Sequence, residues 1–243
     1  FTPNPTAKTV QLTPLIAGKY EFSLTVYDDL GNPSCKPLTQ VVEVVPDNKL
    51  HIELTWTTPG DPTPGDNKGA DLDLHLAHPL GGSEKGQPDL DGNKEPDPWW
   101  SICYDCFWLN PKPEWGDPFD VADNPSVDRD DKDGEGPENL SIKIPETETW
   151  YTISAYVWHD ANFGHSIPRI RIYIDKELVF DKTGPKLNTH DMWCVGQISY
   201  DPLATTTNAK VKLIKECPGA DSAGNLLTPK YPPVSATKSL KCL

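Results

Sequence analysis

The stretch that decides the fold is Asp71-Leu72-Asp73-Leu74-His75-Leu76, in which polar and apolar residues alternate without interruption. Successive side chains of a β-strand point to opposite faces, so the pattern predicts a half-buried strand with its leucines inward. No convincing amphipathic helix pattern is found elsewhere, and the sequence therefore predicts an all-β fold. The other segments with strand patterns are 19–27, 39–45, 50–56, 140–144, 150–158, 170–174, 177–180 and 193–200.

Proline and glycine divide this all-β chain into two tandem β-sandwich modules and a tail. The 243 residues include 26 prolines and 17 glycines, which favours short strands joined by long loops. We expect an incomplete first sandwich over 1–46, a larger sandwich over 47–200, and a coil-rich, disulfide-closed tail over 201–243 with a strand-like run at 210–214. The larger sandwich carries a long insert at 79–138, which we expect to be held by something other than a hydrophobic core.

The acidic charge is concentrated in one part of the chain. Residues 61–138 hold 20 acidic and 6 basic side chains, which accounts for the whole net charge of −14. Such a balance argues against nucleic acid or an anionic membrane as a partner. A solvated or disordered acidic loop is the simplest alternative, but disordered acidic segments are poor in aromatic residues. This one contains Trp99, Trp100, Phe107, Trp108, Trp115 and Phe119.

The densest acidic run extends from Asp128 to Asn139 and includes glycines at 134 and 136. Calcium takes six to eight hard oxygen ligands, which spaced carboxylates near a glycine turn can supply. Asp71 and Asp73 add two carboxylates on one face of a strand, where burial without a cation would be costly. We expect the calcium ligands among Asp71, Asp73, Asp128, Asp130, Asp131, Asp133 and Glu138. A hydrated acidic turn is the alternative, and a second, weaker candidate loop contains Asp89, Asp91 and Asn93.

The six cysteines suggest an oxidising compartment, because their number is even and the chain is acidic and rich in proline. We expect Cys217 to pair with Cys242 across the tail, and Cys103 to pair locally with Cys106. A zinc site would usually need a second Cys-x-x-Cys pair, and a redox motif should open a helix in a βαβ unit. The sequence offers neither.

Histidines and tryptophans offer two further candidate sites. His75 and His78 lie near acids, but positions three apart on a strand face opposite ways, so we expect His75 to bond to the acidic loop instead of zinc. Trp99, Trp100 and Trp108, together with Trp115 and Trp158, could form a platform on which a sugar stacks. The alternative is that these side chains hold the long loops in place from within the core.

Two segments resemble known families. Gly18-x-Tyr20-x-Phe22, the Asp28-Asp29-Leu30-Gly31 turn and Pro46 together resemble the last half of a PKD domain, over about residues 9–46. This resemblance implies an immunoglobulin-like β-sandwich of cell-surface proteins, with its first strands missing. Residues 71–79, 129–138 and 151–158 together resemble the YfaP-like bacterial surface β-sandwiches, over about 50–200. That resemblance implies a non-enzymatic extracellular module, although the insert between the two motifs departs from its pattern.

No catalytic motif persuades us that the chain is an enzyme. It has no Gly-x-Ser-x-Gly, no His-Glu-x-x-His and no glycine-rich phosphate loop, and no window of about 18 apolar residues could span a membrane. A chain beginning at Phe1 reads as a mature product or a proteolytic fragment.

We therefore expect a secreted or cell-surface structural or adhesive module stabilised by calcium. Its partners would be other surface proteins or copies of itself, assembled into a filament by strand addition. The alternative is a carbohydrate-binding module of a larger secreted hydrolase, with glycans as ligands. A hydrolase acting through a pair of carboxylates is a further alternative.

Overall fold

The computed structural model describes residues 7–64, 66, 68–83, 89, 94, 96–132, 134–201, 217 and 226–228. The chain divides into two compact units, Phe1–Pro46 and Asp47–Leu243. Among the described residues the structure is almost entirely β, as the sequence predicted, with one 3₁₀ turn at Pro79–Ser83. None of these residues belongs to a helix that is long and apolar enough to cross a membrane.

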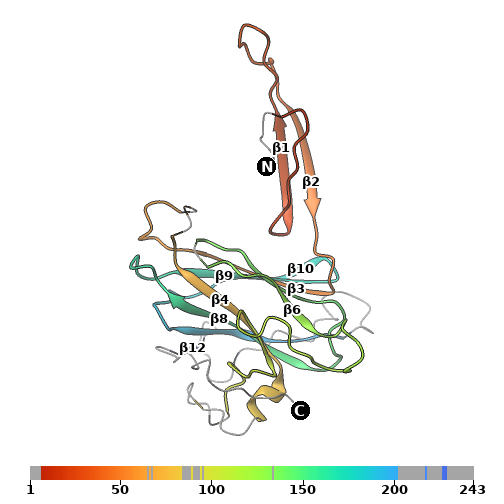
Figure 1. The fold of residues 1–243 in the computed structure, drawn as a ribbon, viewed down its shortest axis with the longest axis vertical. Coiled ribbons are helices and arrows are strands. Elements are labelled where there is room, and N and C mark those ends of the chain that lie inside the picture. Colours follow the sequence, from red (N-terminus) through yellow and green to blue (C-terminus); the bar gives the residue numbers. More distant parts are fainter. Residues whose placement is uncertain are drawn as a thin grey trace. The chain divides into compact units, whose positions relative to one another are not determined.

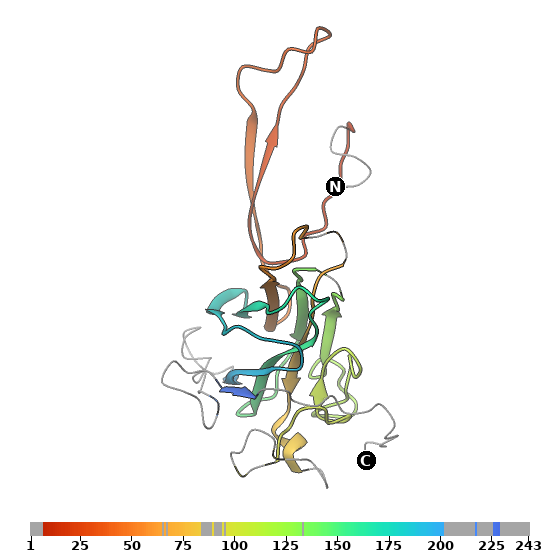
Figure 2. The same cartoon turned by 90° about the vertical axis from the view of Figure 1, so that its left-hand side faces the viewer.

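The first unit is built on a hairpin of β1 (Gly18–Leu24) and β2 (Leu38–Val44), which pair antiparallel along their whole length (Figure 1). Their connecting loop continues well beyond the paired strands (Figure 2). It turns at Asp28, whose carboxylate accepts the backbone N–H groups of Leu30 and Asn32 at 2.9 and 2.8 Å. These two are the only strands among the described residues of this unit, so a PKD-like sandwich here stays a prediction.

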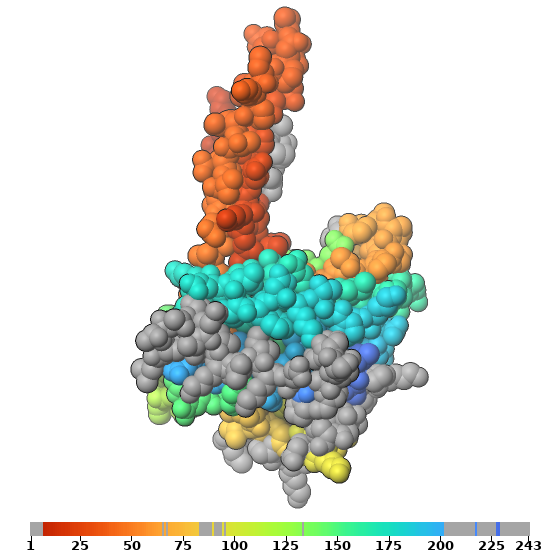
Figure 3. Space-filling view, turned by 180° about the vertical axis from the view of Figure 1, so that it is seen from behind, coloured from red at the N-terminus to blue at the C-terminus, as the bar shows by residue number. Residues whose placement is uncertain are grey.

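The second unit is a sandwich of two five-stranded antiparallel sheets. One sheet has the order β10-β9-β3-β7-β6 and the other β12-β11-β8-β4-β5. The β9–β10 hairpin forms much of the face in Figure 3, where it is drawn in teal. The strands are β3 (Leu50–Thr57), β4 (Asp71–Ala77), β5 (Asp105–Cys106), β6 (Pro125–Arg129), β7 (Glu138–Ile142), β8 (Trp150–His159), β9 (Ile167–Ile174), β10 (Glu177–Thr183), β11 (Met192–Ser199) and β12 (Leu226–Thr228).

The apolar side chains predicted to point inward meet between the two sheets. The alternating leucines of β4 pack there with residues of β3, β7, β8 and β9 in one buried cluster. Each large apolar side chain buried in this way contributes about 1.5–3 kcal/mol. The predicted turn at Asp175-Lys176 joins β9 to β10 with both residues at positive φ, as tight two-residue hairpins require. The run at 210–214 lies outside the described residues.

Described residues of the insert at 79–138 pack in a second hydrophobic cluster, contrary to our expectation that something other than a hydrophobic core would hold it. Residues of the insert pack on the outer face of the second sheet. Two short strands of the insert, β5 and β6, also extend the two sheets at their edges. This second cluster consists of Ala77, Trp99, Trp100, Phe107, Tyr156, Met192, Cys194 and Cys217.

Two disulfides differ from the predicted pairing. Cys217 is bonded to Cys194 of β11, with their Cα atoms 6.2 Å apart, so the predicted Cys217–Cys242 pairing is wrong. Cys106 is a buried free thiol, whereas Cys103 is disulfide-bonded, so the predicted Cys103–Cys106 bridge is wrong as well. Cys242 lies outside the described residues. Spacing along the chain misled both predictions, because long-range strand pairing decides which cysteines meet.

Candidate metal centre

The candidate metal centre lies where β4 of one sheet approaches β7 of the other. Asp71 and Asp73 extend from the outer face of β4, since the leucines between and after them face the core. Glu138 begins β7 and reaches across to β4, where its Oε2 accepts the backbone N–H of Leu74 at 2.6 Å. Carboxylates from two sheets are thereby brought to one place.

The three carboxylates form a tight and nearly dry cluster. Each offers an oxygen that lies within 4.8 Å of the others. Asp73 is 3% exposed and Glu138 is 2% exposed, while the Asp71 side chain retains 13%. Two buried oxygens, Asp73 Oδ2 and Glu138 Oε1, have no hydrogen-bond partner among the described residues. An ionised carboxylate in that position needs a counter-charge.

Burial and neighbouring negative charge both raise the pKa values of Asp73 and Glu138. Desolvation raises the pKa of Asp73 well above its ordinary value, and the neighbouring Asp71 and Asp130 raise it further. Desolvation also raises the pKa of Glu138 well above its ordinary value, with Asp73 as the next cause. Lys132 opposes the shift at Asp73, and its Nζ lies 3.5 Å from Asp130 Oδ2. Asp130 also interacts with the Glu138 side chain and raises its pKa, so Asp130 belongs to the surroundings of the centre.

Asp131 is directed away from the cluster into the turn that follows it. Its carboxylate accepts Arg129 Nη2 at 2.8 Å and the backbone N–H of Gly136 at 3.1 Å. Gly136 has a φ of +84°, and a Cβ there would lie 2.9 Å from the carbonyl oxygen of Leu54. The turn that delivers Glu138 to β4 thus requires glycine at 136 and occupies Asp131 as a structural acceptor.

The other predicted calcium ligands do not join the cluster in the described structure. Asp128 accepts the hydroxyl of Ser126 at 2.7 Å and that of Ser141, so its carboxylate is already satisfied. Asp89 accepts the backbone N–H of Lys94 at 3.0 Å within its own loop. Asp133, Asp91 and Asn93 lie outside the described residues, and the second candidate loop stays a prediction.

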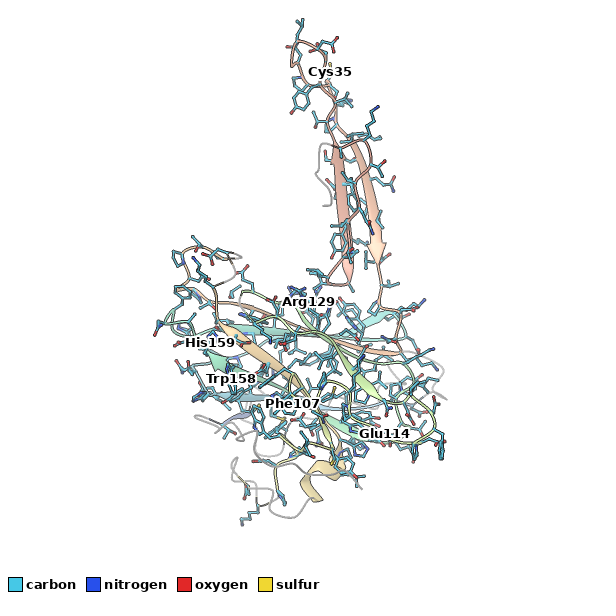
Figure 4. The ribbon with its side chains drawn as sticks, viewed as in Figure 1. Cys35, Phe107, Glu114, Arg129, Trp158 and His159 are labelled. Atoms are coloured by element: carbon cyan, nitrogen blue, oxygen red, sulfur yellow. A yellow bond between two sulfur atoms is a disulfide. The ribbon has the colours of Figure 1, made fainter. Side chains whose placement is uncertain are left out.

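A hollow of about 150 Å³ opens beside the carboxylates. Asp71, Asp73 and Asp130 line it together with Lys132, Trp108 and Trp158. Our sequence reasoning did not single out Lys132. The register of β4 and β8 reveals why Trp158 lies here: Leu72 pairs with Val157 and Asp71 with His159, so Trp158 is the extra residue of a β-bulge. Figure 4 shows Trp158 and His159 side by side at the end of β8.

Three of the five tryptophans considered as a sugar platform are buried. Trp115 is 3% exposed and packs in the cluster between the sheets. Trp99 and Trp100 are 2% and 7% exposed and belong to the cluster under the insert, so assigning them to a stacking platform was wrong. Trp108 is only partly buried. Its ring packs edge to face against that of Trp158, with the ring centroids 5.6 Å apart. The aromatic wall of the hollow is therefore Trp108 with Trp158.

His75 and His78 lie in separate surroundings, which leaves no basis for a shared zinc site. His75 Nδ1 lies 2.8 Å from Asp105 Oδ2 in the insert, which confirms that His75 bonds to the acidic loop. Its Nε2 has no partner among the described residues. His78 Nδ1 accepts the N–H of Leu80 at 3.1 Å, so its Nε2 carries the proton that faces Glu146.

Comparisons with known proteins leave the family of this chain open. No protein-family model matches it, and no curated protein matches it either. One solved structure with a partial likeness is that of the unknown function protein SAV2460, which is 17% identical in sequence. The match covers 67% of this chain and 84% of that one, with a TM-score of 0.39. The PKD-like and YfaP-like resemblances therefore rest on the residues quoted for them.

Proposed function

We propose that this chain is a secreted, non-catalytic structural or adhesive module whose larger sandwich is stabilised by calcium. The observation that carries the proposal is the burial of Asp73 Oδ2 and Glu138 Oε1 without hydrogen-bond partners in the described part of the chain. Burying ionised carboxylates in this way is strongly unfavourable unless a cation joins them. A bound cation would remove the repulsion among Asp71, Asp73 and Glu138.

The ligand set favours calcium among the common metal ions. All three candidate ligands are carboxylates, whereas structural zinc sites are built mostly from cysteine and histidine. Calcium–oxygen bonds of about 2.3–2.6 Å allow ligand oxygens up to about 5 Å apart, and magnesium, with bonds of about 2.0–2.1 Å, allows about 4.2 Å. The three candidate oxygens lie within 4.8 Å of one another, which is within the reach of one calcium ion.

The place of the cluster supports a structural role. Asp71 and Asp73 belong to β4 in one sheet, and Glu138 belongs to β7 in the other. A cation held by all three would tie the two sheets together. The Cys194–Cys217 disulfide and the disulfide at Cys103 are typical of an oxidising compartment. Calcium sites of extracellular modules commonly have dissociation constants of about 10⁻⁴–10⁻³ M.

The test is thermal and urea unfolding in calcium and in excess chelator, with bound metal counted by elemental analysis. At calcium about 100 times its dissociation constant we expect about 2.7 kcal/mol of added stability. Glu138→Gln should abolish this gain. Glu135→Gln is the matched control, because it removes the same charge from an exposed residue of the same run. Absence of metal, together with equal stability in the two solutions, would overturn the proposal.

Assembly by strand addition is a second candidate function, and the exposed side chains of the first unit favour it. Leu24 and Leu38 face each other across the β1–β2 hairpin and are 57% and 71% exposed. Val41 of β2 is 52% exposed as well. A strand from a second copy of the chain would cover such residues. Sedimentation over a wide concentration range tests this, and a monomer throughout would count against it.

A further inference from the structure

The hollow beside the carboxylates and the proposed calcium site share two residues. Asp71 and Asp73 belong to the carboxylate cluster and also line the hollow, whereas Glu138 belongs to the cluster alone. Calcium takes six to eight oxygen ligands, and three carboxylates provide six at most. Any further oxygen that reaches the ion from outside the protein would therefore come through the hollow.

The two tryptophans give this hollow a chemical character of its own. Trp108 comes from the insert and Trp158 from the bulge at the end of β8, and their rings stand edge to face. A β-bulge turns a side chain out of the regular alternation of its strand, and such bulges are over-represented beside functional sites. Indole rings provide large, rigid apolar walls against which the C–H face of a ligand ring can pack.

Charge and size narrow the class of ligand. Asp71, Asp73, Asp130 and Glu138 carry four negative charges when ionised, and one calcium ion with Lys132 carries three positive charges. A small negative excess remains, which favours a neutral ligand over an anionic one. The volume of about 150 Å³ is well below the roughly 300–1,000 Å³ of pockets that enclose drug-sized molecules, so it suits one small ring.

We propose that the hollow binds one ring of a neutral carbohydrate, whose neighbouring hydroxyl oxygens complete the coordination of the calcium ion while Trp108 and Trp158 pack against the ring. This inference rests on the proposed calcium site and assigns it a ligand. The hydroxyl groups supply the hard oxygen atoms that calcium prefers. The aromatic walls supply apolar contact that water cannot, so the sugar displaces water from both parts of the site.

The experiment uses the full chain and the methyl glycosides of mannose, glucose, galactose and fucose as probes. Calcium binding is first measured by titration calorimetry, and each probe is then titrated into the calcium-loaded protein and into protein in excess chelator. We expect binding of at least one probe in calcium and a loss of more than about tenfold in affinity in chelator. For mannose, the 3-deoxy glycoside, which has no neighbouring pair of ring hydroxyls, should bind at least about tenfold more weakly than its parent.

Substitutions test the aromatic wall separately from the cation. Trp158→Ala should weaken sugar binding by about tenfold or more while the chain still binds calcium. Phe119→Ala is the control, because Phe119 is an exposed aromatic residue that does not line the hollow. If Trp158→Ala fails to fold, Trp158→Leu tests the aromatic contact, and the 3-deoxy probe still tests coordination by the hydroxyl groups.

The outcomes separate this inference from the proposed function. A protein that binds calcium but none of the four probes would overturn the sugar site and leave the calcium site standing. A protein that binds no calcium would overturn both. Sugar binding that is equally strong in chelator, or unchanged by substitution of Trp158, would overturn the proposed arrangement.

Discussion

Asp73 and His75 lie two residues apart on the same face of β4, and the chain surrounds them in opposite ways. His75 meets Asp105 at 2.8 Å and stacks on Phe107. Asp73 is grouped with Asp71 and Glu138, and Asp130 also raises its pKa while Lys132 opposes the shift. The comparison teaches that this sandwich gives one buried polar group a partner of its own and leaves the other among like charges, where the proposed calcium ion would act.

The largest loss of stability is expected from breaking the His75–Asp105 pair, in which each side chain is the other's partner. Asp105 is fully buried, and its Oδ2 accepts hydrogen bonds from His75 Nδ1 and from the backbone N–H of Trp100, the latter at 2.7 Å. Asp105→Ala leaves both groups without an acceptor, so we expect a loss of about 3 kcal/mol in the free energy of unfolding. Urea unfolding should give the same loss in calcium and in chelator. A loss confined to the calcium-loaded protein would contradict the comparison.

A smaller loss of stability, which unlike that of Asp105→Ala depends on calcium, is expected at Asp73. Asp73→Asn should remove about 2.7 kcal/mol in calcium at about 100 times the dissociation constant. In chelator the same variant should be at least as stable as the parent chain, because it relieves repulsion from Asp71 and Glu138. Urea unfolding of both proteins in both solutions measures the difference. Equal losses in the two solutions would show that Asp73 acts through packing alone.

The smallest effect concerns a charge pair that water surrounds. Arg169 donates from Nε and Nη2 to the two carboxylate oxygens of Asp181 at 2.7 and 2.6 Å. These hydrogen bonds hold the pKa of Asp181 below its ordinary value. Because the folded-state pKa is depressed, the stabilisation is present above the unfolded pKa of about 3.9 and is lost as pH falls through the folded value.

Asp181→Asn measures that contribution. Both side chains are partly exposed, so solvent screening limits the expected loss to about 0.5 kcal/mol at pH 7. The difference between parent and variant in urea unfolding should shrink toward zero as the pH is lowered below about 3.9. A difference that grows with acidity would be inconsistent with the pair. Added salt should also reduce the stability difference between parent and Asp181→Asn. The same salt should leave the loss caused by Asp105→Ala largely unchanged.

Local sequence patterns predicted those parts of the fold and of the site that depend on residues close together in the chain. Alternation placed β4 and β8, and the Asp175-Lys176 turn joined β9 to β10. The same alternation put Asp71 and Asp73 on one face of β4. Glu138 was expected beside them because its acidic run ends at a glycine turn, and the structure brings all three together.

Long-range contacts decided what the sequence could not foretell. Nothing local distinguishes Asp128, which two serines satisfy, from Glu138, which crosses to another sheet. Trp158 reaches the hollow through a bulge that only the pairing of β4 with β8 reveals. Cysteine pairing was missed for the same reason, since Cys194 and Cys217 are joined through the folded sheet and not through their spacing.

The bond from Leu74 to Glu138 also has a consequence for aggregation. β4 pairs with β8 on one side, while on the other β5 pairs only with Leu76 and Ala77. An open edge of this kind is a template for strands of other molecules. Here Gly134 pairs with Ala70, and the buried Glu138 carboxylate occupies the N–H of Leu74. An intruding strand would have to displace this carboxyl group to reach the N–H of Leu74, so the segment that organises the acids also protects the edge of the sheet from pairing with other molecules.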